Sequence, residues 1–168
     1  MRFYDALKSE LETVTADNWR DKLDALKASN GTWAATARAL GVDKRTVERW
    51  RAGYQPRARA GQPRPGRRQV DPQTFLGKIR AAFVKDRPAQ VAAVDWKRMT
   101  AVATWWNGKY RREQVMHLGA YMSDPEMTAV AGAYVNKDRN GMSGIMNNVI
   151  SNYLGFDAKL ADVESVTF

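Results

Sequence analysis

The fold of the N-terminal part is decided by residues 31–50, which read GTWAATARALGVDKRTVERW. Residues 32–40 and 44–52 both have helical spacing, and the turn between them contains Gly41, which tolerates a positive φ. Ala37 leaves room for a crossing helix. The apolar side chains placed to hold the two helices together are Leu40, Val42, Val47 and Trp50. This pattern, with Asp43 as the cap of the second helix, predicts a helix-turn-helix.

The second of these helices has a polar face opposite its apolar one. Arg45 and Arg49 lie one turn apart on that face, a spacing that suits two neighbouring base pairs in the major groove. Lys44 and Thr46 flank the face and are placed for phosphate contacts. Glu48 has two interpretations: it accepts a hydrogen bond from a cytosine, or it forms an ion pair with Lys44 at i, i+4, which we favour. A solvated charged face and a protein-binding helix-turn-helix are the alternatives.

The distribution of charge favours a nucleic acid as the partner. The chain of 168 residues has 27 Lys and Arg against 18 Asp and Glu, a net charge of +9. Residues 31–112 alone have 19 basic and 5 acidic residues, a net charge of +14. Arg outnumbers Lys by 17 to 10, and the planar guanidinium suits phosphates and guanine edges.

Several function classes are excluded by composition. The absence of Cys and the single His exclude disulfides, thiol catalysis and metal sites built from Cys or His. No paired carboxylates, Ser–His–Asp arrangement or phosphate loop stands out, so we expect neither an enzyme nor a cofactor. No apolar run is long enough to span a bilayer, and the N-terminus has no apolar core of a signal peptide. We therefore expect a cytoplasmic, nucleoid-associated protein.

A basic linker is predicted at residues 54–70, which are rich in Pro and Gly. Its arginines are Arg57, Arg59, Arg64, Arg67 and Arg68. Such a segment either lies in a narrow minor groove or is a flexible linker that adds phosphate contacts.

Residues 71–168 predict a portion that mixes helices with a small antiparallel sheet. Residues 97–106 alternate, and Asn107-Gly108 is typical of a two-residue hairpin turn that would place Trp105 opposite Tyr110. The open face of that hairpin would carry the aromatic and basic side chains Trp106, Lys109, Arg111, Arg98 and His117, together with Thr104. This face resembles a nucleic-acid platform, but packing of Trp106 under a helix or a second subunit is the interpretation that we favour.

The predicted fold class is α+β. We expect an N-terminal all-α helix-turn-helix domain at 1–53, an Arg/Pro-rich linker at 54–70 and a C-terminal small antiparallel sheet with helices at 71–168. Apolar stripes at 127–134 and 146–153 offer a surface for a homodimer or a higher assembly.

The stretch from Ala37 to Trp50, followed by Gly53, Pro56-Arg57 and Arg59, resembles the telomere-associated terminal proteins of actinobacterial linear replicons and related plasmid and phage helix-turn-helix proteins. The resemblance covers residues 32–59. It implies binding to replicon ends and, in the true terminal proteins, a hydroxyl side chain joined covalently to the 5′ end of DNA. It assigns no particular Ser or Thr to that role.

The sequence thus predicts a sequence-specific double-stranded DNA-binding protein, a regulator or replicon-maintenance factor, whose helix 44–52 reads the major groove. A terminal protein that protects or primes replicon ends and an architectural DNA-organising protein are the alternatives. The candidate DNA-binding residues are Thr32, Lys44, Arg45, Thr46, Glu48, Arg49, Arg57, Arg59, Arg64, Arg67 and Arg68.

Overall fold

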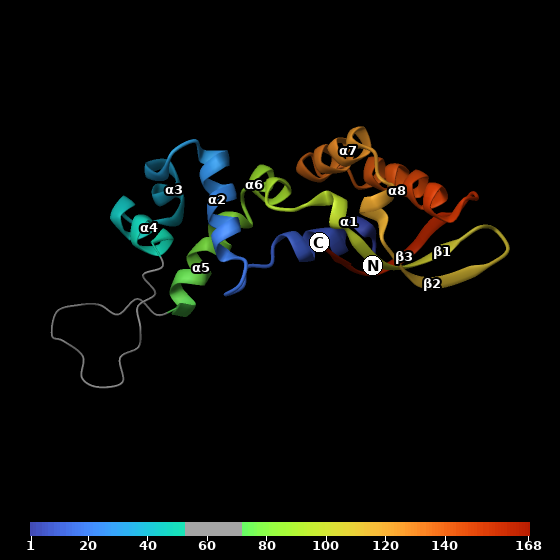
Figure 1. Ribbon diagram of the computed structural model, residues 1–168, viewed down its shortest axis with the longest axis horizontal. Helices are drawn as coiled ribbons and strands as arrows, with labels where there is room; N and C mark the ends of the chain where they lie inside the picture. Colours follow the sequence, from blue (N-terminus) through green and yellow to red (C-terminus); the bar gives the residue numbers. More distant parts are fainter. Residues whose placement is uncertain (53–71) are drawn as a thin grey trace. The chain divides into compact units, whose positions relative to one another are not determined.

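The computed structural model describes residues 1–52 and 72–168, with the backbone alone at 72–75. Within these ranges it has the predicted α+β fold, with helices in the N-terminal part and a three-stranded antiparallel sheet in the C-terminal part (Figure 1). The α-helices are α1 (Phe3–Leu11), α2 (Trp19–Asn30), α3 (Trp33–Leu40), α4 (Lys44–Arg51), α5 (Pro72–Phe83), α6 (Arg87–Ala92), α7 (Asp124–Val135) and α8 (Arg139–Leu154). The strands are β1 (Thr100–Trp106), β2 (Arg111–Met116) and β3 (Lys159–Thr167), with short 3-10 helices at Trp96–Arg98 and Leu118–Tyr121.

The chain divides into two compact units, which differ from the domains predicted from sequence. The helical unit contains residues 14–90, and the sheet unit contains residues 1–13 and 91–168. The predicted boundary at residue 53 is therefore wrong on two counts: α1 belongs to the sheet unit, and α5 belongs to the helical unit. The cause is packing, because apolar periodicity identifies the buried face of a helix but not the surface that covers it.

In the helical unit, α5 packs against α2 through both apolar and polar contacts. Ile79 and Phe83 are completely buried, and the Lys22 ammonium lies 4.8 Å from the centre of the Phe83 ring. At the end of α5, the Ser29 hydroxyl donates a hydrogen bond of 2.8 Å to the Asp86 carboxylate. The helix after the basic segment thus completes the core that the first helices begin.

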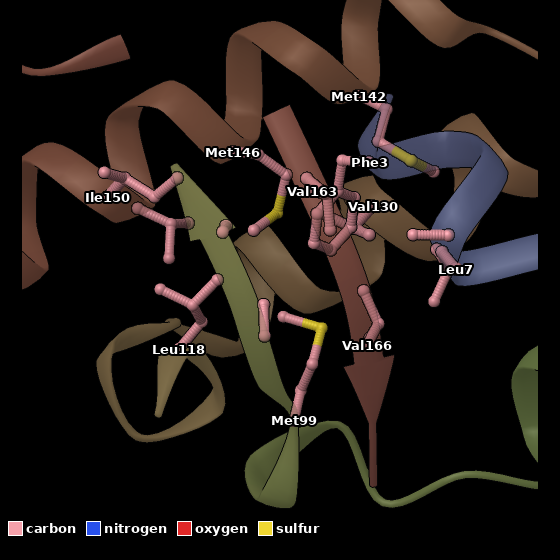
Figure 2. Close-up of a cluster of buried hydrophobic side chains, with 14 of the residues drawn as sticks. Phe3, Leu7, Met99, Leu118, Val130, Met142, Met146, Ile150, Val163 and Val166 are labelled. Carbon is pink, nitrogen blue, oxygen red and sulfur yellow. The ribbon is translucent and has the colours of Figure 1, made fainter. Parts of the chain in front are cut away.

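In the sheet unit, β1 lies between its neighbours in the order β2-β1-β3. One face of β1 presents the buried side chains of Ala101, Ala103 and Trp105. Helices α7 and α8 lie along this face (Figure 1), and Met146 and Ile150 of α8 point down onto it (Figure 2). Other large side chains in this core are Phe3, Leu7, Met99, Met116, Leu118, Val130, Tyr134, Met142, Val149, Val163 and Val166.

Helix α1 is held in the sheet unit by contacts of its first turn and of the residues before it. The Met1 carbonyl accepts a hydrogen bond of 2.8 Å from the backbone N–H of Val163, and the N-terminal amine contacts Asp162. Asp5 forms an ion pair of 2.9 Å with Arg139 of α8. Figure 2 shows Phe3 beside the core residues of this unit.

The hairpin register is shifted by two residues from the prediction. Trp105 pairs with Arg112 rather than Tyr110, because the turn closes on Asn107 and Tyr110. The Asn107 carboxamide oxygen accepts the backbone N–H groups of Lys109 (3.1 Å) and Tyr110 (2.8 Å). Gly108, with φ of 91°, therefore takes the first central position of the turn instead of the second. A shift by two keeps the side chains of the two strands on their predicted faces, whereas Tyr110 lies in the turn, outside both strands, and is exposed.

The apolar stripes that offered a dimer surface are used inside the sheet unit. Val130 and Tyr134 of α7 are fully buried, as are Met146, Val149 and Ile150 of α8. These side chains are therefore not available for pairing of two chains, and the homodimer stays a prediction. In the described part of the chain, no helix is both long and apolar enough to cross a membrane.

Candidate nucleic-acid interface

Helix α4 is fixed to α3 by a turn whose geometry follows from three residues. Gly41 has the left-handed conformation, with φ of 68°, and the N–H of the following Val42 reaches back to the Ala37 carbonyl at 3.0 Å. Asp43 then caps α4 by accepting the Thr46 N–H at 2.7 Å. These local hydrogen bonds determine where α4 starts.

The apolar side of α4 holds it against the helical unit. Val47 is completely buried and Trp50 is buried, as are Ala37 and Leu40 of α3. Leu40, Val47 and Trp50 are three of the four side chains expected to hold the pair together, and the fourth, Val42, is half-buried. The opposite side of α4 is exposed, so its polar face is available for binding.

Two arginines dominate this exposed face. Arg45 and Arg49 are both exposed and are separated by one helical turn. Over residues 1–52 and 72–168, neither guanidinium takes part in a hydrogen bond or an ion pair. Because no hydrogen bond or ion pair within the described residues holds them, both can turn toward an external acceptor.

Hydrogen bonds from the backbone and side chain of Thr46 lower the pKa of Asp43. The charge of Arg49 acts in the same direction with a smaller effect. Asp43 is therefore an ionised cap at neutral pH. Thr46, a predicted phosphate contact, is half-buried and is engaged with this cap.

Glu48 forms the ion pair with Lys44 that we favoured from the sequence. Its carboxylate lies 3.4 Å from the Lys44 ammonium, and the two side chains are half exposed or more. An exposed pair of this kind contributes about 0.3–0.5 kcal/mol. Both groups can therefore separate at little cost when a partner approaches.

Arg51 lies on the same helix, but its side chain contacts other helices of the helical unit. Its guanidinium is 3.7 Å from the Asp24 carboxylate of α2 and 4.3 Å from the centre of the Trp33 ring of α3. These contacts tie the end of α4 to two neighbouring helices. Arg51 therefore does not belong to the candidate interface.

Thr32 is the N-cap of α3. Its hydroxyl accepts the N–H of Ala35 at 3.1 Å, and its side chain is exposed. The lone pairs and proton of the hydroxyl leave room for a phosphate contact in addition to the cap.

Lys78 is a cation at this site that the sequence reasoning missed. Its ammonium donates a hydrogen bond of 3.4 Å to the carbonyl of Gly41, in the turn between α3 and α4. The two residues are 37 positions apart with the basic segment between them, and no local pattern links them. The other predicted residues, Arg57, Arg59, Arg64, Arg67 and Arg68, lie outside the described residues.

The charge of the sequence is divided between the two units. Residues 14–90 have 17 Lys and Arg against 7 Asp and Glu, a net charge of +10. The sheet unit has 10 basic and 11 acidic residues, a net charge of −1. The exposed arginines of α4 therefore belong to the part of the chain that attracts polyanions.

Other kinds of site find little support in the described ranges, where no group of three or more His, Asp or Glu is arranged to hold a metal ion. Comparison of the chain with protein-family models, with curated proteins and with solved structures finds no significant match. The geometry and charge of the helical unit are therefore the features that bear on function.

Proposed function

We propose that this protein binds double-stranded DNA in a sequence-specific manner, with the α3–α4 pair acting as a helix-turn-helix whose second helix enters the major groove. The observation that carries this proposal is that Arg45 and Arg49 are both exposed, with no hydrogen bond or ion pair in the described part of the chain, on a helix whose other side is buried. Arginine recognises the O6 and N7 atoms of guanine with two parallel hydrogen bonds. One helical turn between the two side chains suits neighbouring base pairs.

The remaining groups of the interface have positioning roles in this proposal. Lys44 and Lys78, at the N-terminal end of α4 and at the preceding turn, contact phosphates on one side of the groove. The arginines of segment 54–70 extend the contact along the backbone or into an adjacent minor groove. These contacts set affinity and register, whereas Arg45 and Arg49 set the preferred sequence.

The test is the affinity of an Arg49→Ala variant for its selected duplex and for random duplex DNA of equal length. On the selected duplex the variant should lose about 1–3 kcal/mol, with relaxed preference at one base pair. On random DNA the loss should be smaller, because the lost contact is to a base. An Arg98→Ala variant is the matched control, since Arg98 is an exposed arginine of the sheet unit that pairs with Asp95.

An equal loss on both duplexes would show that Arg49 contacts a phosphate rather than a base. No loss on either duplex would contradict the proposal for α4. Folding is checked separately by the thermal unfolding of each variant, which an exposed Arg-to-Ala change should leave within about 0.5 kcal/mol of the wild type.

A single helix-turn-helix makes few base contacts, and two copies on neighbouring half-sites supply the specificity that one lacks. We therefore include a homodimer in the proposal, formed through surfaces other than the buried stripes of α7 and α8. Light scattering over a range of concentrations, with and without a duplex that carries two half-sites, tests it. A single copy bound per duplex at all concentrations would contradict the dimer and leave the α4 interface intact.

A further inference from the structure

The β1–β2 hairpin exposes two aromatic side chains among cations. Trp106 is 46% exposed and Tyr110 is 58% exposed. Trp106 pairs with Arg111 on β2 and with Lys159 on β3, so that its neighbour on each adjoining strand is a basic residue. The Lys109 ammonium lies 5.2 Å from the centre of the Tyr110 ring. These five residues are called the hairpin-tip cluster below.

The folding of the sheet unit does not account for this cluster. Trp105 points to the helix-covered face, where it is 7% exposed and its ring packs 5.3 Å from that of Phe156. Trp106 points to the opposite face, and Figure 1 shows α7 and α8 on one side of the sheet only. Among the described residues, no ion pair involves Lys109, Arg111 or Lys159. Trp106 therefore does not pack under a helix of its own unit.

The rows of the open face limit the positive surface to the tip. In the next row along the sheet, Thr104 pairs with Glu113 and Asp162, which are both acidic. A polyanion that ran along the whole face would meet the exposed carboxylate of Glu113, while the carboxylate of Asp162 is paired with the N-terminal amine. The surface that suits a nucleic acid is thus the end of the hairpin, which holds only a short stretch of chain.

Arg98 and His117, which the sequence grouped with Trp106, lie at the other end of the sheet. Arg98 pairs with Asp95 at 3.4 Å, and the His117 ring nitrogen lies 3.1 Å from the Thr100 hydroxyl. Thr100 and Trp106 are the two ends of β1, about 20 Å apart at the usual rise of a strand. The predicted platform is therefore divided in the structure. Its cationic and aromatic residues lie at the tip of the hairpin, whereas Arg98 and His117 lie at the opposite end of the sheet and contact neighbouring residues there.

We propose that the hairpin-tip cluster binds single-stranded DNA, with one or two unpaired bases stacked on Trp106 and Tyr110. Lys109, Arg111 and Lys159 would hold the adjoining phosphates. Stacking on an exposed aromatic ring tolerates any base, because every base has a π face. This site is separate from α4 and serves unpaired rather than paired DNA; the choice of DNA over RNA rests on the proposed function.

The test measures binding of a labelled short oligothymidylate to the full chain by fluorescence anisotropy. The protein carries Arg45→Ala and Arg49→Ala, so that the α4 interface is removed from the measurement. Adding Trp106→Ala should weaken binding by roughly five- to 150-fold, the range expected for the loss of one stacked base. Val115→Ala, which truncates a 56% exposed side chain on the same face two rows from the tip, is the matched control and should leave binding unchanged.

The phosphate contacts are tested by the salt dependence of the same binding. An Arg111→Gln/Lys159→Gln variant should reduce the slope of log K against log salt by about 1.4, the value for two phosphate contacts on a single strand. Arg98→Gln, which removes a charge at the other end of the sheet, should leave the slope unchanged.

Four outcomes would overturn the proposal. The first is oligothymidylate binding that is absent from the full chain or unaffected by Trp106→Ala and Tyr110→Ala. The second is a loss confined to duplex DNA, which would make the tip part of the duplex interface. The third is tighter binding of oligouridylate than of oligothymidylate. The fourth is conversion of a dimer to a monomer by Trp106→Ala in sedimentation velocity, which would make the tip a contact between copies. Failure of α4 to bind a duplex, with the oligothymidylate result intact, would overturn the proposed function alone.

Discussion

Residues 14–90 build the helical unit from one continuous stretch, whereas the sheet unit is assembled from both ends of the chain, 1–13 and 91–168. The helical unit has a net charge of +10 and the sheet unit a net charge of −1. The difference shows that neighbours in the sequence need not share a core, since α1 precedes the helical unit but packs in the other one. The net positive charge, to which we attribute the proposed duplex binding, also belongs to one unit only. Each prediction below separates the two units by experiment.

The largest expected effect concerns where the helical unit ends. A fragment of residues 14–90 should unfold cooperatively on heating, and a fragment of residues 1–53 should not. The shorter fragment lacks Ile79 and Phe83, and burial of each such side chain contributes about 1.5–3 kcal/mol to a unit whose total stability is about 5 kcal/mol. Circular dichroism during thermal unfolding measures both. A cooperative transition of the 1–53 fragment at the same temperature as that of 14–90 would contradict this division.

Leu7→Ala tests the assignment of α1 to the sheet unit. Leu7 is fully buried in that core, and its truncation should cost about 2–5 kcal/mol. Hydrogen exchange should show faster exchange in α8 and β3 and no change in α2, α3 and α4. The matched control is Leu23→Ala in α2, which should have the reverse pattern because Leu23 is buried in the helical unit. Faster exchange in α3 and α4 after Leu7→Ala would show that α1 packs in the helical unit and would contradict the assignment.

A smaller effect is expected from the basic segment between α4 and α5. Replacing Arg67 and Arg68 by Ala should reduce the slope of log K against log salt for duplex binding by roughly one to two units. Lys97→Ala together with Arg98→Ala removes the same charge from the sheet unit, where both side chains pair with nearby carboxylates. This control should leave the slope unchanged. An unchanged slope in the Arg67/Arg68 variant would mean that the segment makes no phosphate contact.

The smallest effect is the pH dependence of the cap of α4. The folded-state pKa of Asp43 lies below its ordinary value of 3.8, so the unfolded chain binds its proton more readily than the folded chain does. The stabilisation by Asp43 is therefore complete above pH 3.8 and is lost as the pH falls through the lowered folded-state value. Thermal unfolding should show an Asp43→Asn variant to be less stable than the wild type at neutral pH, with a difference that shrinks in acid. Thr32→Ala removes a cap that does not titrate, so its loss of stability should be independent of pH over this range. A loss of stability in Asp43→Asn that grew in acid would contradict the assignment.

The local structure of α3 and α4 could be predicted because its causes are local. The carboxylate of Asp43 caps α4 by accepting the N–H of Thr46, three residues further on, and Gly41 ends the preceding helix, so a short stretch of sequence contains the whole explanation. The inward positions of Val47 and Trp50 follow from helical spacing alone.

The parts that could not be predicted depend on contacts between distant residues. The periodicity of α1 indicates an apolar face but not that β3 and α8 cover it. Lys78 reaches the turn at Gly41 only because α5 packs on the first helices, which no pattern near residue 78 encodes. In the hairpin, Asn107-Gly108 correctly predicts a tight turn. The side chain of Asn107 selects which of two adjacent turns forms, and the register changes by two residues.

The central claim is that the exposed face of α4 selects a DNA sequence. The most direct measurement is a pull-down of genomic fragments at near-physiological salt, followed by sequencing, with the wild-type protein and the Arg45→Ala/Arg49→Ala variant in parallel. We expect a shared sequence motif for the wild type and its loss in the variant. A motif inside the replicon would favour a regulator, whereas enrichment of replicon ends would favour an end-binding role. Fragments without any shared motif, or the same motif with both proteins, would contradict the claim that Arg45 and Arg49 read the bases.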